Sequence, residues 1–406
     1  MAKEIFSAKN LYGSHNQTPP LVMAAPQRYI QGPGVISEIG RYIGIINVKR
    51  VGILASRRGL AAEGARVAES LHSNHIESVD CIFDGECSLP EIEKHVAALN
   101  DENIDCLIAV GGGKPVDAGK SISWRLDIPV VIVPTLASND APCSALSVLY
   151  TPEGASDVVE FYPTSPTLVV MDTDIVADAD ERYLVAGMGD AMATWYEARV
   201  CMNNPDARTP LGARPTLASC AMGEICAHTL FEHGEAAAKS VVASQNGDAL
   251  EKVVEANTLL SGIGFESGGL ALAHPMALAY TQIDELHTNY LHGEMVAMGT
   301  MVQLAMEQSG DAEKVARFFA RVGLPIHLGQ FSVSPQDSGK LDIIIASAMA
   351  NANSHQMPMK VTQDSLLQAI MDAHELGLSI AEETGDDAYW RLRAWPIRQP
   401  KLAITC

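Results

Sequence analysis

The sequence predicts an α/β half built on a parallel sheet, followed by an all-α half. Two observations predict this fold class. Between residues 28 and 171, short apolar runs alternate with stretches of helical length, which is the pattern of a parallel sheet wound by right-handed crossovers. After about Glu181 the sequence changes to long helical stretches without convincing strands. A chain of 406 residues is long enough for two domains, each with its own core.

The elements of the first half follow one another in regular order. Strands are predicted at 50–55, 76–83, 106–110, 128–133 and 167–171. Helices are predicted near 34–45, at 59–72, at 89–99 and directly after the third strand. Residues 147–150 and 158–162 flank the turn sequence Thr151-Pro-Glu-Gly-Ala and are predicted to form a hairpin.

The second half is predicted to be helical throughout. Its helices are expected at 181–202, 210–233, 246–263, 291–308, 312–322, 336–352 and 363–381. The predicted organisation is an N-terminal arm (1–26), a dinucleotide-binding α/β domain (27–178), a helical metal and substrate domain (179–383) and a C-terminal tail (384–406). The arm is expected to lie on a neighbour or to stay loose. The tail carries Trp390 and Trp395 and is expected to pack on something, such as another subunit.

A Gly-rich turn separates the strand at 106–110 from the helix that follows it. The three glycines at 111–113 allow a sharp turn and a close approach to a ligand. Pro115 suits the first helical position, so the amides of Gly113 and Lys114 are expected to face outward at the positive end of the helix. Such an arrangement can hold a pyrophosphate. A plain tight turn explains three glycines equally well, because neither G-x-G-x-x-G nor a Walker loop is present.

Composition and charge exclude several classes of partner. Hydrophobic residues make up 47% of the chain and charged residues 19%, which is typical of a globular enzyme. The net charge of -21 repels nucleic acid and anionic lipid, and no apolar run approaches the length of a membrane span. With no signal sequence evident, we expect a cytoplasmic protein. The eight cysteines include no C-x-x-C pair, so we interpret them as reduced, buried thiols.

Three ionisable residues stand in strongly apolar, helical surroundings. Asp190 lies within Gly187-Met-Gly-Asp-Ala-Met-Ala, while His274 and His292 lie within Ala271-Leu-Ala-His-Pro and Tyr290-Leu-His-Gly-Glu-Met. A buried carboxylate needs a cation or dense hydrogen bonding, and one divalent metal would satisfy all three side chains. One Asp and two His with an open position form a catalytic ligand set for Zn²⁺ or Fe²⁺. Taken singly, each histidine is better explained as a core residue bonded to a carbonyl and Asp190 as a helix N-cap, because no local spacing joins them.

Five motifs together resemble the glycerol dehydrogenase branch of the iron-containing (group III) alcohol dehydrogenase family. In the same order as in that family, over roughly residues 27 to 380, they are Gly111-Gly-Gly-Lys-Pro-Val-Asp117, Pro134-Thr-Leu-Ala-Ser-Asn-Asp-Ala-Pro-Cys-Ser-Ala-Leu-Ser-Val148, Ala186-Gly-Met-Gly-Asp-Ala-Met-Ala-Thr194, Gly264-Phe-Glu-Ser-Gly-Gly-Leu270 and His292-Gly-Glu. The resemblance implies a Rossmann-like N-terminal domain and a helical C-terminal domain, the dehydroquinate synthase-like architecture, with a metal-assisted, nicotinamide-dependent site between them.

The resemblance also implies roles for particular residues. The metal ligands would be Asp190, His274 and His292, with zinc favoured and iron the alternative. Asp140 would meet the substrate hydroxyls, although an Asx-turn before Pro142 explains this aspartate as well. The dinucleotide, NAD or NADP, would contact a set of residues made up of Ser56, Arg57, Gly112, Gly113, Lys114, Asp117, Thr135, Ser138, Ser144, Leu146 and Tyr150. A bound divalent ion acidifies an alcohol as it does water, and the cofactor takes the hydride.

Three features depart from the pattern of this branch. Ser56 stands where an acidic residue often binds the adenosine ribose. Arg57 and Arg58 beside it could accept a 2′-phosphate or be two ordinary solvated arginines. Ala277 stands where a further histidine usually follows the first histidine ligand. Pro275 disfavours the α conformation at His274, so this ligand is expected at a kink.

The predicted function is a metal-dependent NAD(P)-linked dehydrogenase that interconverts a small diol or polyol, glycerol-like, with its ketone or aldehyde. One alternative on the same fold is an NADPH-dependent reductase of 2-oxo acids or other carbonyls. A second alternative is a non-catalytic dinucleotide-binding protein. It would have lost turnover because Ala277 replaces the histidine that is usual at this position. A dehydroquinate-synthase-like lyase is disfavoured because its basic phosphate-binding residues are not evident. The family resemblance implies a homo-oligomer, an octamer or a dimer.

Overall fold

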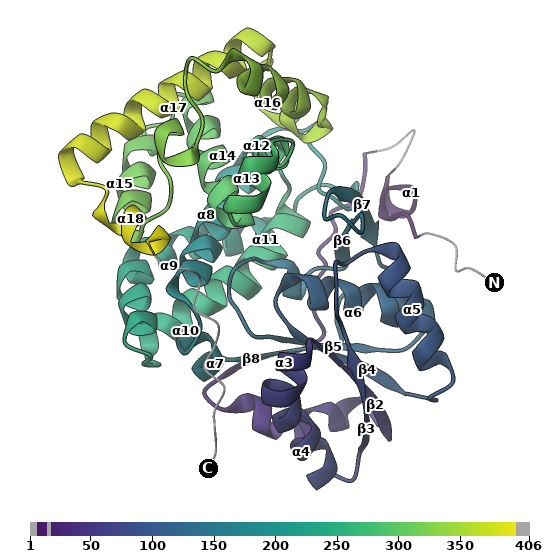
Figure 1. Ribbon diagram of the computed structural model, residues 1–406. Helices are drawn as coiled ribbons and strands as arrows, with labels where there is room; N and C mark the ends of the chain where they lie inside the picture. Colours follow the sequence, from purple (N-terminus) through teal and green to yellow (C-terminus); the bar gives the residue numbers. More distant parts are fainter. Residues whose placement is uncertain (1–5, 14–17, 395–406) are drawn as a thin grey trace.

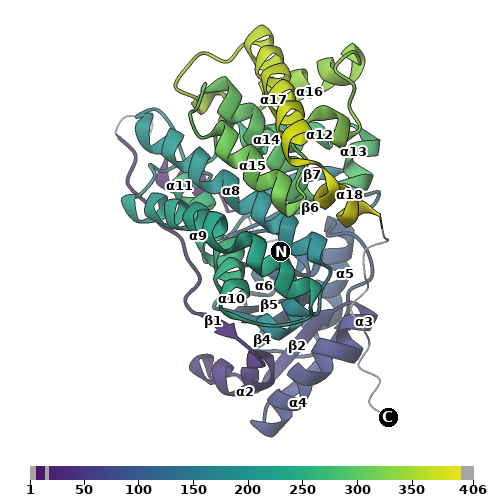
Figure 2. The same cartoon turned by 90° about the vertical axis from the view of Figure 1, so that its left-hand side faces the viewer.

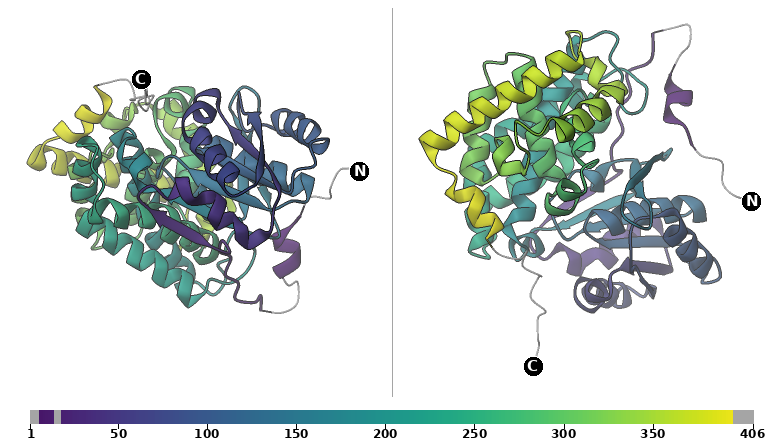
Figure 3. Two further views of the ribbon diagram at one scale, coloured as in Figure 1. Left: turned by 90° about the horizontal axis from the view of Figure 1, so that it is seen from below. Right: turned by 45° about the horizontal axis from the view of Figure 1, so that its top comes forward.

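The computed structural model describes residues 6–13 and 18–394. A sheet with its helices forms one half of the described chain and a bundle of helices forms the other (Figure 1). The helical half lies above the sheet half in Figure 1 and in the right-hand view of Figure 3. The predicted α/β half followed by an all-α half is therefore confirmed.

The main sheet has six parallel strands in the order β1-β8-β5-β4-β2-β3. Their bounds are Tyr29–Gly32 (β1), Arg50–Ala55 (β2), Glu77–Ile82 (β3), Cys106–Gly111 (β4), Val130–Pro134 (β5) and Leu168–Asp172 (β8). The five predicted strands are confirmed. The sequence analysis missed β1, because this short edge strand carries Gln31 and is mostly half-buried.

Helices cover both faces of the sheet. On one face, α5 (Leu89–Asn100) and α6 (Gly113–Leu126) pack against Leu107, Ala109 and Ile132. On the other face, α2 (Ile39–Tyr42) and α4 (Ala65–Ser73) pack against alternate residues of the same strands. The remaining helical segments here are η1 (Val35–Glu38), η2 (Ile43–Ile46), α3 (Arg57–Gly59) and η3 (Leu60–Gly64). The helix predicted near 34–45 is thus a series of short segments.

The predicted hairpin is also confirmed, as the antiparallel pair β6 (Leu146–Tyr150) and β7 (Ser156–Phe161). It begins just after the short segment η4 (Ala141–Cys143) that follows β5. A buried lysine joins this segment to α6. The Lys120 ammonium donates to the carbonyls of Ala141, at 2.9 Å, and Leu146 and lies 2.8 Å from the Asp117 carboxylate.

The described part of the second half contains helices and no strand. The helices are α7 (Thr173–Ala177), α8 (Glu181–Asn203), α9 (Leu217–Val242), α10 (Asp248–Glu255), η5 (Ala256–Leu260), α11 (Ser261–Gly268), α12 (Ala273–Tyr280), α13 (Asp284–Asn289), α14 (His292–Met306), α15 (Ala312–Val322), η6 (Leu328–Phe331), α16 (Ser338–Ala350), η7 (Ala352–Gln356), α17 (Gln363–Thr384) and α18 (Asp387–Arg393). The helix predicted from residue 210 begins only at Leu217, because Pro210 and Pro215 precede Thr216, which caps it.

The described arm and tail both pack on their own chain. Beyond the short helix α1 (Ala8–Tyr12), the arm runs along the helical half, where Pro20 accepts the amide of Arg214 at 2.9 Å and Ala24 donates to Ser267 Oγ at 2.9 Å. The tail forms α18, which packs with α17 on α15 (yellow in Figure 2). Trp395 lies outside the described residues. Contact with a neighbour is therefore not needed to explain either segment.

The predictions about membrane spans and about the cysteines can be compared with the described residues. No helix there is both long and apolar enough to cross a bilayer. Seven of the cysteines are buried free thiols, and burial raises the pKa of each of them; that of Cys81, for example, rises to about 11.

Candidate active site

Three helices of the second half bring together the residues predicted to bind a metal. Asp190 lies in the middle of α8, His274 in the first turn of α12 and His292 at the start of α14. Asp190 Oδ1 is 3.4 Å from Nε2 of His274 and 3.4 Å from Nε2 of His292. One ligand atom from each residue lies within 4.8 Å of the others. The spacing is small enough for a single ion to reach all three side chains.

The charges around Asp190 fit a cation. Its side chain is 1% exposed, and Oδ1 is a buried oxygen without a hydrogen-bond partner among the described residues. Burial acts to raise the pKa of Asp190, but the two histidines beside it lower that pKa well below its usual range. Burial opposes a charged ring at His274, yet Glu197 and Asp190 raise the pKa of that imidazole. A divalent metal at this point would satisfy the free oxygen directly.

Glycines allow the three helices to approach this closely. A Cβ on Gly293, next to His292, would lie 1.8 Å from the carbonyl oxygen of Ala186 on α8. A Cβ on Gly299 of α14 would lie 2.2 Å from the Ala273 carbonyl, beside His274. Real Cβ atoms do not approach so closely, so the geometry of the cluster depends on bare backbone at these two positions.

Asp140 lies directly against this cluster, in the loop after β5. Its backbone amide donates to Asp190 Oδ2 at 3.3 Å, and its carboxyl accepts from Ser261 Oγ at 2.9 Å. Burial, with a further contribution from the charge of Asp190, raises the pKa of Asp140 to about 7. The structure thus places the predicted substrate residue beside the predicted metal ligands.

The Gly-rich turn leaves the same edge of the sheet. Gly111 ends β4 with a φ of 150°, and Gly112 is the N-cap of α6. Pro115 is therefore the third helical residue and not the first, as the sequence analysis had predicted. The amides of Gly113 and Lys114 begin the helix, as expected. The Lys114 side chain is over half exposed, and its ammonium lies 2.6 Å from Glu86.

The other predicted cofactor residues lie along this edge, with varied surroundings. Thr135 donates its amide to Gly111 at 3.0 Å, whereas Ser144 is buried beside Lys120. Asp117 accepts the amide of Val148 at 3.0 Å, so its carboxylate attaches the hairpin to α6. The remaining members are Gly112, Gly113, Ser138, Leu146 and Tyr150, all in the β4–α6 turn, the loop after β5 or β6.

Ser56 and Arg57 follow β2, two strands away from β5 in the sheet order. Ser56 Oγ accepts the amide of Gly59 at 3.0 Å and caps the helix, while Arg57 is exposed. The next arginine, Arg58, forms an ion pair with Glu63, with Nη2 at 3.3 Å from Oε1. These positions agree with a surface that could meet the adenosine end of a dinucleotide.

The predicted kink at Pro275 is absent. Leu272 is the N-cap of α12, so His274 and Pro275 are its second and third helical residues. The first amides of a helix have no partner within the helix, so a proline there removes no hydrogen bond. Ala277, on the next turn, is completely buried.

Comparison with known proteins decides the family. Residues 26–173 match the family described as iron-containing alcohol dehydrogenase. The glycerol dehydrogenase of Citrobacter freundii is 40% identical over 88% of this chain and 98% of its own length. The chain belongs to this family. It is a metal-dependent, NAD(P)-linked alcohol oxidoreductase acting on a small molecule, and the predicted enzyme class is confirmed.

Further relatives of this iron-containing alcohol dehydrogenase extend the comparison. The glycolaldehyde reductase of Halobacterium salinarum is 36% identical over 89% of the chain and 99% of its own length. Among solved structures, the glycerol dehydrogenase of Schizosaccharomyces pombe superposes with a TM-score of 0.85 at 32% identity, covering 91% of this chain and 94% of that one. The comparison with this solved structure therefore also confirms the predicted fold.

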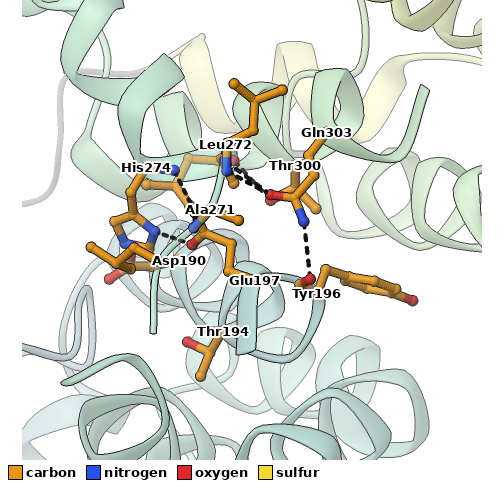
Figure 4. A network of polar contacts seen from close by, with 12 residues as sticks. Asp190, Thr194, Tyr196, Glu197, Ala271, Leu272, His274, Thr300 and Gln303 are labelled. Atoms are coloured by element: carbon orange, nitrogen blue, oxygen red, sulfur yellow. Dashed lines mark hydrogen bonds and ion pairs between the residues drawn. The ribbon is translucent and has the colours of Figure 1, made fainter. Parts of the chain in front are cut away.

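Sequence analysis missed several buried polar residues near the site, two of which, Glu197 and Gln303, contact the His274 region. Glu197 contacts the ring of His274, and Gln303 contacts the start of α12 (Figure 4). Glu266 accepts the amide of Ala145, with its two oxygens at 3.0 and 3.2 Å. Glu197 follows Asp190 by seven positions, so both carboxylates lie on one face of α8 two turns apart. That spacing inside an apolar helix was the available signal.

Proposed function

We propose that this enzyme interconverts a small vicinal diol or polyol, such as glycerol, with its hydroxyketone or hydroxyaldehyde. The single observation that supports it best is the contact between Asp140 and the Asp190–His274–His292 cluster. Relatives that cover nearly the whole chain are named glycerol dehydrogenase and glycolaldehyde reductase, whose named substrates carry neighbouring oxygens.

In the proposed mechanism, separate groups of residues position the metal, the substrate and the cofactor. Asp190, His274 and His292 would hold a divalent ion, which supplies Lewis-acid polarisation of a substrate oxygen when bound. The Asp140 carboxylate, beside this cluster, would accept a hydrogen bond from the neighbouring hydroxyl. The amides of Gly113 and Lys114 would hold the cofactor pyrophosphate. A nicotinamide cofactor held there would supply the hydride acceptor or donor for the substrate carbon.

We propose zinc as the resident metal, with iron as the alternative. The donor set, one carboxylate oxygen and two imidazole nitrogens, suits both ions. Metal analysis of purified protein distinguishes them. We further propose a dinucleotide-binding domain at 27–178 and a metal and substrate domain at 179–383, a homo-oligomer, as either an octamer or a dimer, and a cytoplasmic location.

Arg57 is proposed to set the preference between NAD and NADP. It is an exposed cation just after β2, where no carboxylate stands to meet a ribose hydroxyl. Loss of one charge-assisted contact with a 2′-phosphate corresponds to about a tenfold to hundredfold change. We expect Arg57→Ala to weaken NADP by that factor and to leave NAD unchanged, as measured by kcat/KM for each cofactor. Arg41→Ala, at another exposed arginine, is the control; equal losses for both cofactors would contradict the proposal.

The substrate class is tested with purified protein, its metal content and a panel of substrates. We expect about one zinc per chain, highest kcat/KM on vicinal diols, loss of activity with a chelator and recovery with zinc alone. Preference for 2-hydroxy acids would support the alternative reductase of 2-oxo acids. Stoichiometric metal without turnover on any panel member would support the non-catalytic alternative.

A further inference from the structure

The hydrogen bonds of Glu197 converge on one predicted metal ligand. This carboxylate is completely buried on α8. Its Oε2 lies 2.5 Å from Nδ1 of His274, and its Oε1 accepts the backbone amides of His274, at 3.1 Å, and Ala271, at 2.9 Å (Figure 4). Glu197 therefore holds both the ring and the backbone of the same histidine.

The contact with the ring fixes which nitrogen of His274 can bind a cation. A carboxylate accepts only, so Nδ1 must carry a proton that it donates to Glu197. In the neutral ring, this leaves the lone pair on Nε2, the nitrogen that lies 3.4 Å from Asp190 Oδ1. The orientation required for a metal is thus established by the protein itself.

A second buried side chain, that of Gln303, also accepts backbone amides at the start of α12. Gln303 of α14 accepts the amides of Leu272, at 3.0 Å, and Ala273, at 3.1 Å, and donates to the carbonyl of Tyr196 at 2.9 Å. Four consecutive amides at this helix start are thus held by side chains from α8 and α14. These are the helices that carry Asp190 and His292.

We propose that Glu197 is a positioning residue that sets the affinity of the Asp190–His274–His292 site for its divalent cation. This inference rests on the proposed function. A simpler role, capping α12, would require only contacts with backbone amides. Gln303 makes contacts of that kind alone with the helix start, at the two amides that Glu197 does not bind. The contact with Nδ1 goes beyond capping.

The test compares two isosteric substitutions of fully buried glutamates. Glu197→Gln places an amide where a carboxylate accepted three N–H groups, so either the ring or the backbone contact is lost. Glu266→Gln changes an equally buried carboxylate, which in the described part of the chain accepts the Ala145 amide alone. The dissociation constant for Zn²⁺ is measured by competition with a chromogenic chelator, with NADH binding and the unfolding temperature of the metal-free protein measured alongside.

We expect Glu197→Gln to weaken Zn²⁺ binding about 10–100-fold, the usual effect of removing such a partner, while NADH binding stays the same. Glu266→Gln should leave Zn²⁺ binding unchanged. Equal Zn²⁺ affinity in wild type and Glu197→Gln, or equal losses in both variants, would overturn the inference. If Glu197→Gln does not fold, Glu197→Asp supports the same comparison with an intermediate loss. A wild-type protein that binds no divalent cation would contradict the proposed function itself.

Discussion

Replacing His292 by alanine is expected to abolish metal-dependent activity while leaving the fold intact. This side chain is 44% exposed, so its removal leaves no buried cavity. It would, however, remove one of the three proposed ligands and, of these three, the one at the open side of the cluster. We expect the bound metal to fall below stoichiometry and kcat/KM to fall by about 10³-fold or more, since a metal contributes several kcal/mol to such reactions.

Three measurements distinguish this outcome from general damage. Metal content and kcat/KM should fall together, while the unfolding temperature of the metal-free protein should match that of the metal-free wild type. His287→Ala, at a half-buried histidine on the neighbouring α13, is the control and should retain both metal and activity. A His292→Ala enzyme with full metal content and undiminished turnover would show that the cluster is not the metal site.

Replacing Gly293 by alanine is expected to destabilise the protein and to disturb the same cluster. The new methyl group would lie 1.8 Å from the Ala186 carbonyl oxygen, which belongs to the backbone of α8 and cannot turn aside. Overpacking of this kind costs about 1–3 kcal/mol and sometimes more. Because His292 is the preceding residue, separation of α14 from α8 should also lengthen its distance from Asp190.

The control for this change is Gly310→Ala, since nothing lies within 4 Å of a Cβ at that position. Urea unfolding should show a clear loss for Gly293→Ala and little change for Gly310→Ala. Zn²⁺ affinity should follow the same order. If Gly293→Ala is as stable as wild type and binds Zn²⁺ equally well, the close approach of α8 and α14 is not what positions His292.

Much of the fold could be predicted from the sequence because the signals were local. The strands β2, β4 and β5 are apolar runs of the length that a buried parallel strand needs. Proline positions were predicted less well. Pro115 and Pro275 both occupy the third helical position, where a missing amide costs as little as at the first.

The site was only partly predictable, since its contacts cross long stretches of chain. Asp190, His274 and His292 could be singled out, because charged or polar groups in apolar helices need partners. Which partner each has depends on helix packing. The spacing of Asp190 and Glu197 marks a shared face of α8, but it does not show that the Glu197 carboxylate meets His274. The same holds for Lys120, which an alternation of strands and helices predicts as an ordinary helix residue.

The three candidate ligands belong to three different helices, so an unfolded chain offers no preformed chelate. Metallation should therefore follow assembly of α8, α12 and α14, and dialysed protein should regain its ion without refolding. Because such an ion binds only the native state, added Zn²⁺ should raise the melting temperature in proportion to the logarithm of its concentration above saturation. A thermal-shift titration thus reports occupancy even in variants that have lost turnover.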